Sequence, residues 1–166
     1  MRCRRWLVLA MAAGLTVGCA GRRIEDGLFH SPKGYRVRLP GPDWVVAGSW
    51  RADLELRHPG GGAAMMVHAV CGPVARRPPD VLERHLLLGL RERRVLEQGQ
   101  ATVGGLPARH LLLEAVAPPD PTPVQIEAHV VIGPECVYDL VYAAAPDRFA
   151  LHRPAYRRLV SSFATE

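Results

Sequence analysis

The sequence is poor in aromatic residues, which make up 6% of the chain, and it holds a single lysine, Lys33, beside 20 arginines. Glycine and proline, by contrast, account for 31 of the 166 residues. This balance favours short elements that are joined by many turns. The length fits one domain, on a prior of roughly 100–200 residues per domain.

No large excess of positive charge remains once the N-terminus is set apart. The formal net charge is +5, but Arg2, Arg4 and Arg5 are clustered in the first five residues. Removing them from the 21 basic residues leaves 18 against 16 acidic residues, a net charge of +2. The remaining arginine pairs are dispersed among acids, which is typical of solvated surfaces. The sequence therefore predicts no nucleic-acid partner.

The common catalytic and metal-binding motifs are also missing. There is no Gly-x-Ser-x-Gly, no Cys-x-x-Cys and no His-x-x-x-His, and Gly60–Gly62 lacks the Lys-Ser/Thr of a phosphate loop. His68 and Cys71 are three residues apart on an expected strand, so their side chains point to opposite faces. We predict no catalytic residue, cofactor site or metal site, although ligands distant in sequence stay open. Ser49 is the residue that a hydrolase interpretation would use as nucleophile.

The N-terminus carries the clearest signal. Three arginines precede Trp6–Val17, an uncharged run of twelve residues, within the ~7–15 residues of a signal-peptide core and short of the ~20 of a membrane-spanning helix. The run ends in Leu15-Thr16-Val17-Gly18-Cys19, which resembles the lipobox of bacterial lipoprotein precursors, although Thr16 stands where the family prefers leucine. The resemblance implies a signal peptide at 1–18, lipidation at Cys19, and a tether at 19–30. Ordinary signal cleavage and an uncleaved anchor remain as alternatives.

Two cysteines remain after Cys3 leaves with the signal and Cys19 takes lipid. Cys71 and Cys136 form an even pair in an oxidising compartment, where a disulfide is possible. Each, however, stands at the end of an apolar strand, where buried thiols are common. The position at the strand ends favours two unbonded core thiols, and a disulfide remains as the alternative.

The domain expected over 31–166 alternates strands with two helices. The patterns predict strands at 35–39, 44–46, 53–57, 64–71, 100–103, 106–116, 124–130 and 136–143, with Gly104-Gly105 as a hairpin turn. A helix is expected from Pro78-Pro79-Asp80 to Gln98, and a second after Pro146-Asp147 that Pro154 divides. Its core stripe is Tyr156, Leu159, Val160 and Phe163. Asp53 and Glu55 are expected on a solvent face, and Trp44 in the core or at a sheet edge. Hairpin-length links predict an α+β fold with an antiparallel central sheet of six or seven strands, flanked by helices.

The order of these elements resembles the PsbP-like superfamily, which includes the Ran-binding Mog-type proteins and many bacterial lipoproteins. The matching segments run through the expected domain: Gly34-Tyr35-x-Val37-x-Leu39-Pro40 with Trp44, Gly105-Leu106-Pro107-Ala108, Val137-Tyr138-x-Leu140-x-Tyr142 with Ala145-Pro146 and Phe149, and Leu159-Val160-x-Ser162-Phe163. The resemblance implies an antiparallel sheet flanked by helices. Members mostly bind proteins or assist assembly, and the family offers no catalytic residues to transfer.

These observations predict a lipid-anchored, non-enzymatic protein-interaction or assembly module of the cell envelope. Ala20 follows the lipidated cysteine, and by resemblance to known sorting rules the lack of Asp there favours the outer membrane, facing the periplasm. The expected partners are the membrane, through the anchor, and an envelope protein. Two alternatives remain: a periplasmic carrier of a small molecule or metal, and a hydrolase with a non-standard site.

Overall fold

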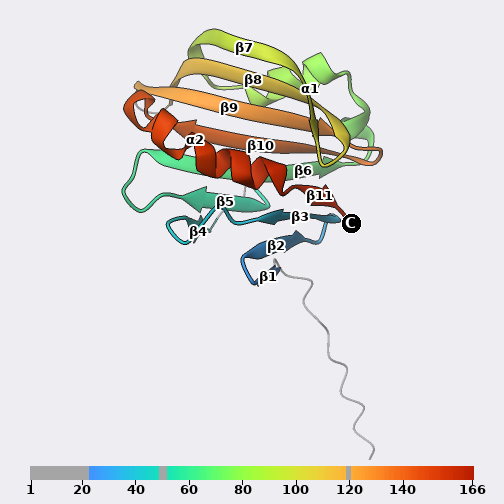
Figure 1. Ribbon diagram of the computed structural model, residues 1–166. Helices are drawn as coiled ribbons and strands as arrows, with labels where there is room; N and C mark the ends of the chain where they lie inside the picture. Colours follow the sequence, from blue (N-terminus) through green and yellow to red (C-terminus); the bar gives the residue numbers. More distant parts are fainter. Residues whose placement is uncertain (1–22, 49–51, 119–120) are drawn as a thin grey trace, which may run out of the picture.

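The computed structural model describes residues 23–48, 52–118 and 121–166 (Figure 1). The proposed signal peptide, Cys19, Ser49 and Trp50 lie outside these residues. No helix in the described ranges is long and apolar enough to cross a membrane.

A seven-stranded antiparallel sheet forms the centre of the domain, which confirms the predicted α+β class. Its spatial order is β4 (Val45–Ala47), β5 (Leu54–Arg57), β6 (Ala63–Cys71), β10 (Cys136–Ala144), β9 (Thr122–Ile132), β8 (Leu106–Ala117) and β7 (Arg91–Val103). Five of the strands have nine or more residues, and four of these, β6, β10, β9 and β8, pair with one another in continuous registers. The Gly104-Gly105 turn joins β7 to β8 with Val103 opposite Leu106, as the sequence predicts.

A second, smaller sheet has the order β1 (Arg23–Glu25), β2 (Leu28–Ser31), β3 (Tyr35–Arg38) and β11 (Ala164–Thr165). The expected tether was therefore wrong over residues 23–30, which form a hairpin. Asp26 and Gly27 both have positive φ angles, 49° and 72°, and Asp-Gly is a strong signal for a two-residue turn. Phe29 follows that turn and is fully buried, so packing fixes the segment.

The two helices cover opposite faces of the large sheet. α2 (Pro146–Ser161) packs on β10, β9 and β6 and lies in front of them in Figure 1, whereas α1 (Pro79–Leu86) packs behind, against β9. A short 3-10 helix, Pro73–Arg76, leads into α1. The α2 side of the sheet holds the aromatic core, with Tyr35, Tyr142, Tyr156 and Phe29 fully buried. The α1 side holds smaller clusters of leucine, valine and alanine.

The first helix was predicted too long. It ends at Leu86, and Gly89, with a φ of +89°, reverses the chain so that β7 begins at Arg91. The segment 91–98 is exposed and mostly charged, with Val95 and Leu96 as its apolar residues, a pattern that fits an exposed helix as well as an exposed strand. The strand is favoured because β8 pairs with this segment, with register shifts between Arg91 and Glu97 and regular pairing from there to Val103. Arg94 also forms an ion pair with Glu114 across the two strands at 2.6 Å.

The second helix was expected to break at Pro154 and does not. A proline inside a helix forfeits the hydrogen bond to the carbonyl four residues earlier, here that of Ala150. Ala150 is exposed, so water can take the place of the lost donor. The predicted stripe is correct: Tyr156, Leu159 and Phe163 are buried and Val160 packs against the same core.

Cys71 and Cys136 are bonded to each other. Cys71 and Cys136 are opposite each other at the end of the β6–β10 ladder, and their sulfurs form a disulfide. The favoured prediction of two unbonded thiols is therefore wrong, and the disulfide that stayed open is present. The strand register explains this bond, because two cysteines that end neighbouring antiparallel strands in register are held side by side. Their spacing in the sequence does not reveal this pairing. Trp44 is 6% exposed and belongs to the core, as predicted.

Candidate functional site

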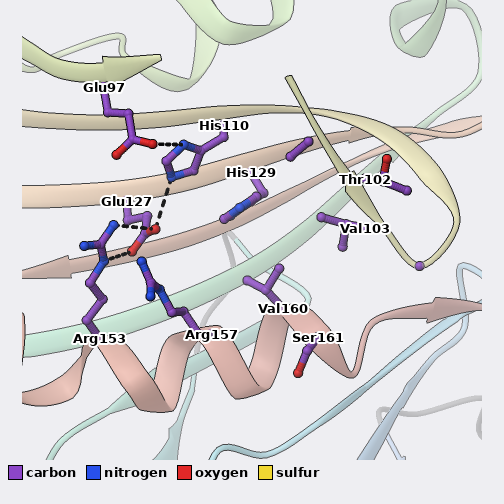
Figure 2. Close-up of a pocket in the computed structure, with 12 residues that line it drawn as sticks. Glu97, Thr102, Val103, His110, Glu127, His129, Arg153, Arg157, Val160 and Ser161 are labelled. Carbon is purple, nitrogen blue, oxygen red and sulfur yellow. Dashed lines mark hydrogen bonds and ion pairs between the residues drawn. The ribbon is translucent and has the colours of Figure 1, made fainter. Parts of the chain in front are cut away.

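A cavity opens where α2 leaves part of the sheet uncovered. It has a volume of about 450 Å³ and is lined by β7, β8, β9 and the second half of α2. Its polar lining comes from Glu97, His110, Glu127, His129, Arg153 and Arg157, which Figure 2 shows converging from sheet and helix. Ala101, Val103 and Val160 supply an apolar wall.

Glu127 is the centre of the polar cluster. Its side chain is 3% exposed, although it stands in the middle of β9 between Ile126 and Ala128. Arg153 donates to both carboxylate oxygens, from Nε to Oε2 at 2.7 Å and from Nη2 to Oε1 at 3.0 Å. His110 Nε2 lies 3.1 Å from Oε1. A buried carboxylate is tolerable only with such partners, and here the fork of one arginine supplies two of them.

These contacts determine the ionisation of Glu127. Burial alone raises the pKa of a carboxyl group, but the hydrogen bonds from Arg153 and His110, with their charges, outweigh it and hold the pKa of Glu127 below its usual value. The interaction also raises the pKa of Arg153, chiefly through the hydrogen bond to Glu127. The pair therefore stays fully charged at neutral pH.

His129 is held in one neutral form. The Tyr156 hydroxyl donates to the Leu140 carbonyl oxygen at 2.7 Å and has one proton to give. His129 Nδ1, 2.9 Å from that hydroxyl, must then be the donor, which fixes the tautomer with hydrogen on Nδ1. Burial, with His110 and Arg157 nearby, lowers the pKa of His129 to about 4. Its Nε2 is thus an unprotonated acceptor, and it makes no hydrogen bond within the described part of the chain.

His110 links the cluster to the edge strand. It is directly opposite His129 in the β8–β9 register, and the two ring centroids are 4.9 Å apart. Its Nδ1 lies 3.7 Å from Glu97 Oε1 on β7, while Nε2 contacts Glu127. The imidazole therefore bridges an exposed acid and a buried one, as the dashed lines of Figure 2 show.

Arg157 is the cation of the cluster without a carboxylate. It follows Arg153 by one helical turn on α2 and points toward His129 and Glu127 in Figure 2. Among the residues that the structure describes, it makes no hydrogen bond or ion pair, and its charge acts on His129. A guanidinium with unused donors at the mouth of a cavity is suited to an anionic group.

The structure brings together residues that the sequence left unassigned. Glu127 and His129 lie on an expected alternating strand and His110 on the strand before it, and no role was predicted for any of them. The structure turns all three toward α2 and the cavity. The signal in the sequence was the pattern Glu127-x-His129 facing an arginine-rich helix, but only the register and the helix position make it a site.

Other candidate residues are placed elsewhere. No group of three or more His, Cys, Asp or Glu side chains in the described ranges is arranged to hold a metal ion. Cys71 is in the disulfide, so it offers no thiol beside His68. Ser49 lies outside the described residues.

Asp53 was expected on a solvent face, and this is wrong. Its side chain is 15% exposed and its Oδ1 is 2.8 Å from Lys33 Nζ. Its Oδ2 accepts from the Ala69 backbone N at 2.8 Å and from the Tyr35 hydroxyl at 3.0 Å. Asp53 thus ties the small sheet to the large one, and paired charges of this kind have a structural role.

Comparison with known proteins supports the fold. No protein-family model matches the sequence, and no curated protein matches it. Among solved structures, the chain is similar to the cyanobacterial PsbP protein CyanoP from Synechocystis, with a TM-score of 0.63 and 15% identity over 91% of this chain and 96% of that one. The chain therefore has a PsbP-like fold.

Two further structures share the architecture. LpqN of Mycobacterium tuberculosis, described as involved in cell envelope biogenesis, gives a TM-score of 0.62 and 18% identity over 82% of this chain and 88% of that one. A Bacteroides thetaiotaomicron protein gives a TM-score of 0.58 and 9% identity over 89% of this chain and 49% of that one. Identities this low show the fold alone.

Proposed function

We propose that this chain is a non-enzymatic binding module of the cell envelope, which holds a protein partner at the cavity beside α2. The observation that carries the proposal is the fixed protonation of the cavity. Glu127 is ionised and its hydrogen-bonding capacity is largely taken by Arg153 and His110. The pKa of His129 is about 4, far from the neutral range in which a proton-transfer group works best. Groups held in this way can bind and orient a partner.

The fold likeness supports the location and the class of function. The chain has a PsbP-like fold, and the resemblance of its sequence to that superfamily implies a protein that binds other proteins. LpqN, which shares the fold, is described as involved in cell envelope biogenesis. We therefore extend the proposal to an envelope-associated assembly role, in which the partner is an envelope protein.

The anchor is the second part of the proposal. The N-terminal pattern that ends at Cys19 supports cleavage before that residue and acylation of its thiol. Two or more acyl chains make a stable membrane anchor, at about 0.8 kcal/mol for each buried methylene. Since β1 begins at Arg23, the folded domain would be held close to the membrane surface, which we place at the periplasmic side of the outer membrane.

Intact-mass measurement of the protein isolated from its native envelope tests the anchor. We expect a mature chain that begins at Cys19 and carries the added mass of the acyl groups. The variant Cys19→Ser is expected to leave the membrane fraction. An unmodified sulfur, or a mature N-terminus elsewhere, contradicts this part of the proposal.

Site-specific photo-crosslinking in the living cell tests the partner. A photoreactive residue at Thr102, an exposed position on the cavity wall, is compared with one at Arg84, which is exposed on α1 at the opposite face. We expect one recurring envelope protein from Thr102 and none from Arg84. Equal labelling from both positions, or none from either, argues against a partner at the cavity.

A periplasmic carrier of small molecules is the second candidate. The cavity of about 450 Å³ lies within the range of ~300–1,000 Å³ that is usual for ligand pockets. Native mass spectrometry of the protein from the periplasmic face should then show a bound small mass that Arg157→Gln removes. A bare protein under the same conditions excludes this candidate.

A further inference from the structure

We propose that the cavity binds a carboxylate whose neighbouring atoms carry an N–H or O–H donor and a small apolar group. This inference rests on the proposed function, since it names the chemistry that the cavity recognises. The geometry assigns one anchoring residue, Arg157, one hydrogen-bond acceptor, His129, and one apolar wall to such a ligand.

The anchor follows from a comparison of two arginines one turn apart on α2. Arg153 places its fork on Glu127 and has a side chain only 27% exposed. Arg157 lines the same cavity, yet none of its donors is used by the described residues. The planar guanidinium matches a carboxylate through two parallel hydrogen bonds, which gives orientation as well as attraction.

The charge of the cluster selects a monoanion. Arg153 neutralises Glu127, so Arg157 is the cation left to attract a ligand, while Glu97 adds a negative charge at the rim beside His110. A carboxylate with one charge is balanced by Arg157. A dianionic phosphate would bring a second negative charge close to the carboxylates of Glu97 and Glu127, which would repel it.

His129 adds a directional requirement. Because Tyr156 fixes hydrogen on Nδ1, the lone pair of Nε2 can only accept. A ligand that fills the cavity therefore satisfies His129 with a donor of its own, such as an amide N–H or a hydroxyl. A buried acceptor left without a donor would lose binding energy, so ligands that lack this group are disfavoured.

The apolar wall sets the rest of the ligand. Ala101 and Val103 on β7 face the cavity together with Val160 on α2. This wall suits a short aliphatic side group. A carboxylate, an adjacent N–H and a short side chain together describe an N-acyl amino acid, which is the chemistry shared by the C-terminus of a polypeptide and by a free small acid.

Isothermal titration calorimetry on the full-length protein, purified from the envelope in detergent, tests the assignment. The probes are N-acetylalanine, its C-terminal amide, N-acetylproline, which lacks the N–H, and a tetrapeptide that ends in alanine with a free carboxylate. We expect dissociation constants at or below about 1 mM for N-acetylalanine and the tetrapeptide. The amide and N-acetylproline are expected to bind about tenfold more weakly or worse.

Tighter binding of the tetrapeptide than of N-acetylalanine identifies a polypeptide terminus as the source, and equal binding identifies a free acid. Arg157→Gln should weaken the acids about tenfold to hundredfold, whereas the matched control Arg148→Gln, an exposed arginine on the same helix, should leave them unchanged. His129→Phe should remove the preference for N-acetylalanine over N-acetylproline.

The inference is overturned if the acids fail to bind, if the amide binds as well as the acid, or if Arg157→Gln and Arg148→Gln act alike. These outcomes are separable from failure of the proposed function. A partner still captured at Thr102 while all acids fail would reject the carboxylate chemistry alone, and failure of both measurements would reject the binding site itself.

Discussion

Two carboxyl groups on neighbouring strands of the large sheet behave in opposite ways. Glu127 on β9 faces α2, and Asp139 on β10 faces the α1 side, where His68 and Val130 are its cross-strand neighbours. Hydrogen bonds from Arg153 and His110 hold the pKa of Glu127 below its usual value despite burial. Burial raises the pKa of Asp139 to about 6.

The difference shows that partners, and not burial alone, decide which face can carry fixed charge. On the α2 side, one helix brings two arginines over the sheet, and a polar cluster with a cavity results. On the α1 side, the short helix contributes apolar residues such as Leu82, and no hydrogen bond or ion pair to Asp139 is present in the described part of the chain. The α2 face is therefore suited to binding, whereas on the α1 face the ionisation of Asp139 costs folding free energy.

Among the variants that test this comparison, the removal of Arg153 should have the largest effect on stability. Arg153→Ala leaves the Glu127 carboxylate buried with His110 as its remaining partner, and breaking a buried pair in this way costs about 3–5 kcal/mol. Chemical denaturation at neutral pH measures the loss. Arg148→Ala on the same helix, which removes an exposed pair with Asp147, should cost less than about 1 kcal/mol. Similar losses for the two variants would show that the Glu127 pair is not special.

Asp139→Asn should stabilise the protein at alkaline pH. The pKa of Asp139 is raised from 3.8 to about 6, so the folded state favours the protonated acid and loses stability as pH rises through 6. The cost at pH 8 is up to about 3 kcal/mol, which the uncharged amide avoids. Denaturation at pH 8 and pH 4 measures the gain, which should be confined to the higher pH.

The exposed Asp80 provides the control for that variant. Asp80→Asn removes a surface pair with Arg84 and should change stability by less than about 1 kcal/mol at either pH. A gain from Asp139→Asn that is equal at both pH values would contradict an ionised, buried carboxyl as its cause.

Tyr156→Phe should have a smaller effect, confined to the α2 side. The variant removes the hydroxyl that bonds both Leu140 and His129, and the unpaired buried groups cost about 1–2 kcal/mol. Tyr138→Phe is a matched control, because the structure gives its hydroxyl no partner among the described residues, and it should cost less. Nitrogen NMR should also show that His129 loses its preference for hydrogen on Nδ1, and an unchanged tautomer would argue against the hydrogen-bond assignment.

Arg157→Gln should have the smallest effect on stability. Since no described residue bonds its guanidinium, the free energy of unfolding should change by less than about 0.5 kcal/mol. Thermal denaturation beside Arg153→Ala measures the contrast between two arginines one turn apart. A large loss from Arg157→Gln would show that it holds the fold and is not reserved for a ligand.

Local signals in the sequence predicted much of the fold. Pro146-Asp147 begins α2, Gly104-Gly105 makes the β7–β8 turn, and the stripe from Tyr156 to Phe163 packs in the core. These succeed because each depends on residues close in the chain. The prediction for segment 91–98 was wrong because its pattern fits both a helix and a strand, and pairing with β8 selects the strand.

The cavity could not be predicted because its contacts are distant in sequence. Glu127 meets Arg153 only after β9 pairs with β10 and α2 folds back over both. The same reason applies to the disulfide, since Cys71 and Cys136 are 65 residues apart and meet through strand register. Residue types alone identified candidates, whereas their partners came from tertiary structure.

An NMR pH titration that follows the carboxyl carbon of Glu127 and the imidazole of His129 tests the central claim most directly. The account predicts that Glu127 stays ionised at pH values below 4.5, the ordinary pKa of a glutamate. It also predicts that His129 stays neutral down to about pH 4. Both shifts mean that the unfolded chain takes up protons first, so stability should fall with acid, from about pH 6.5 for His129. Titration of either group between about pH 5 and 8 would contradict a cavity whose charges are fixed for binding.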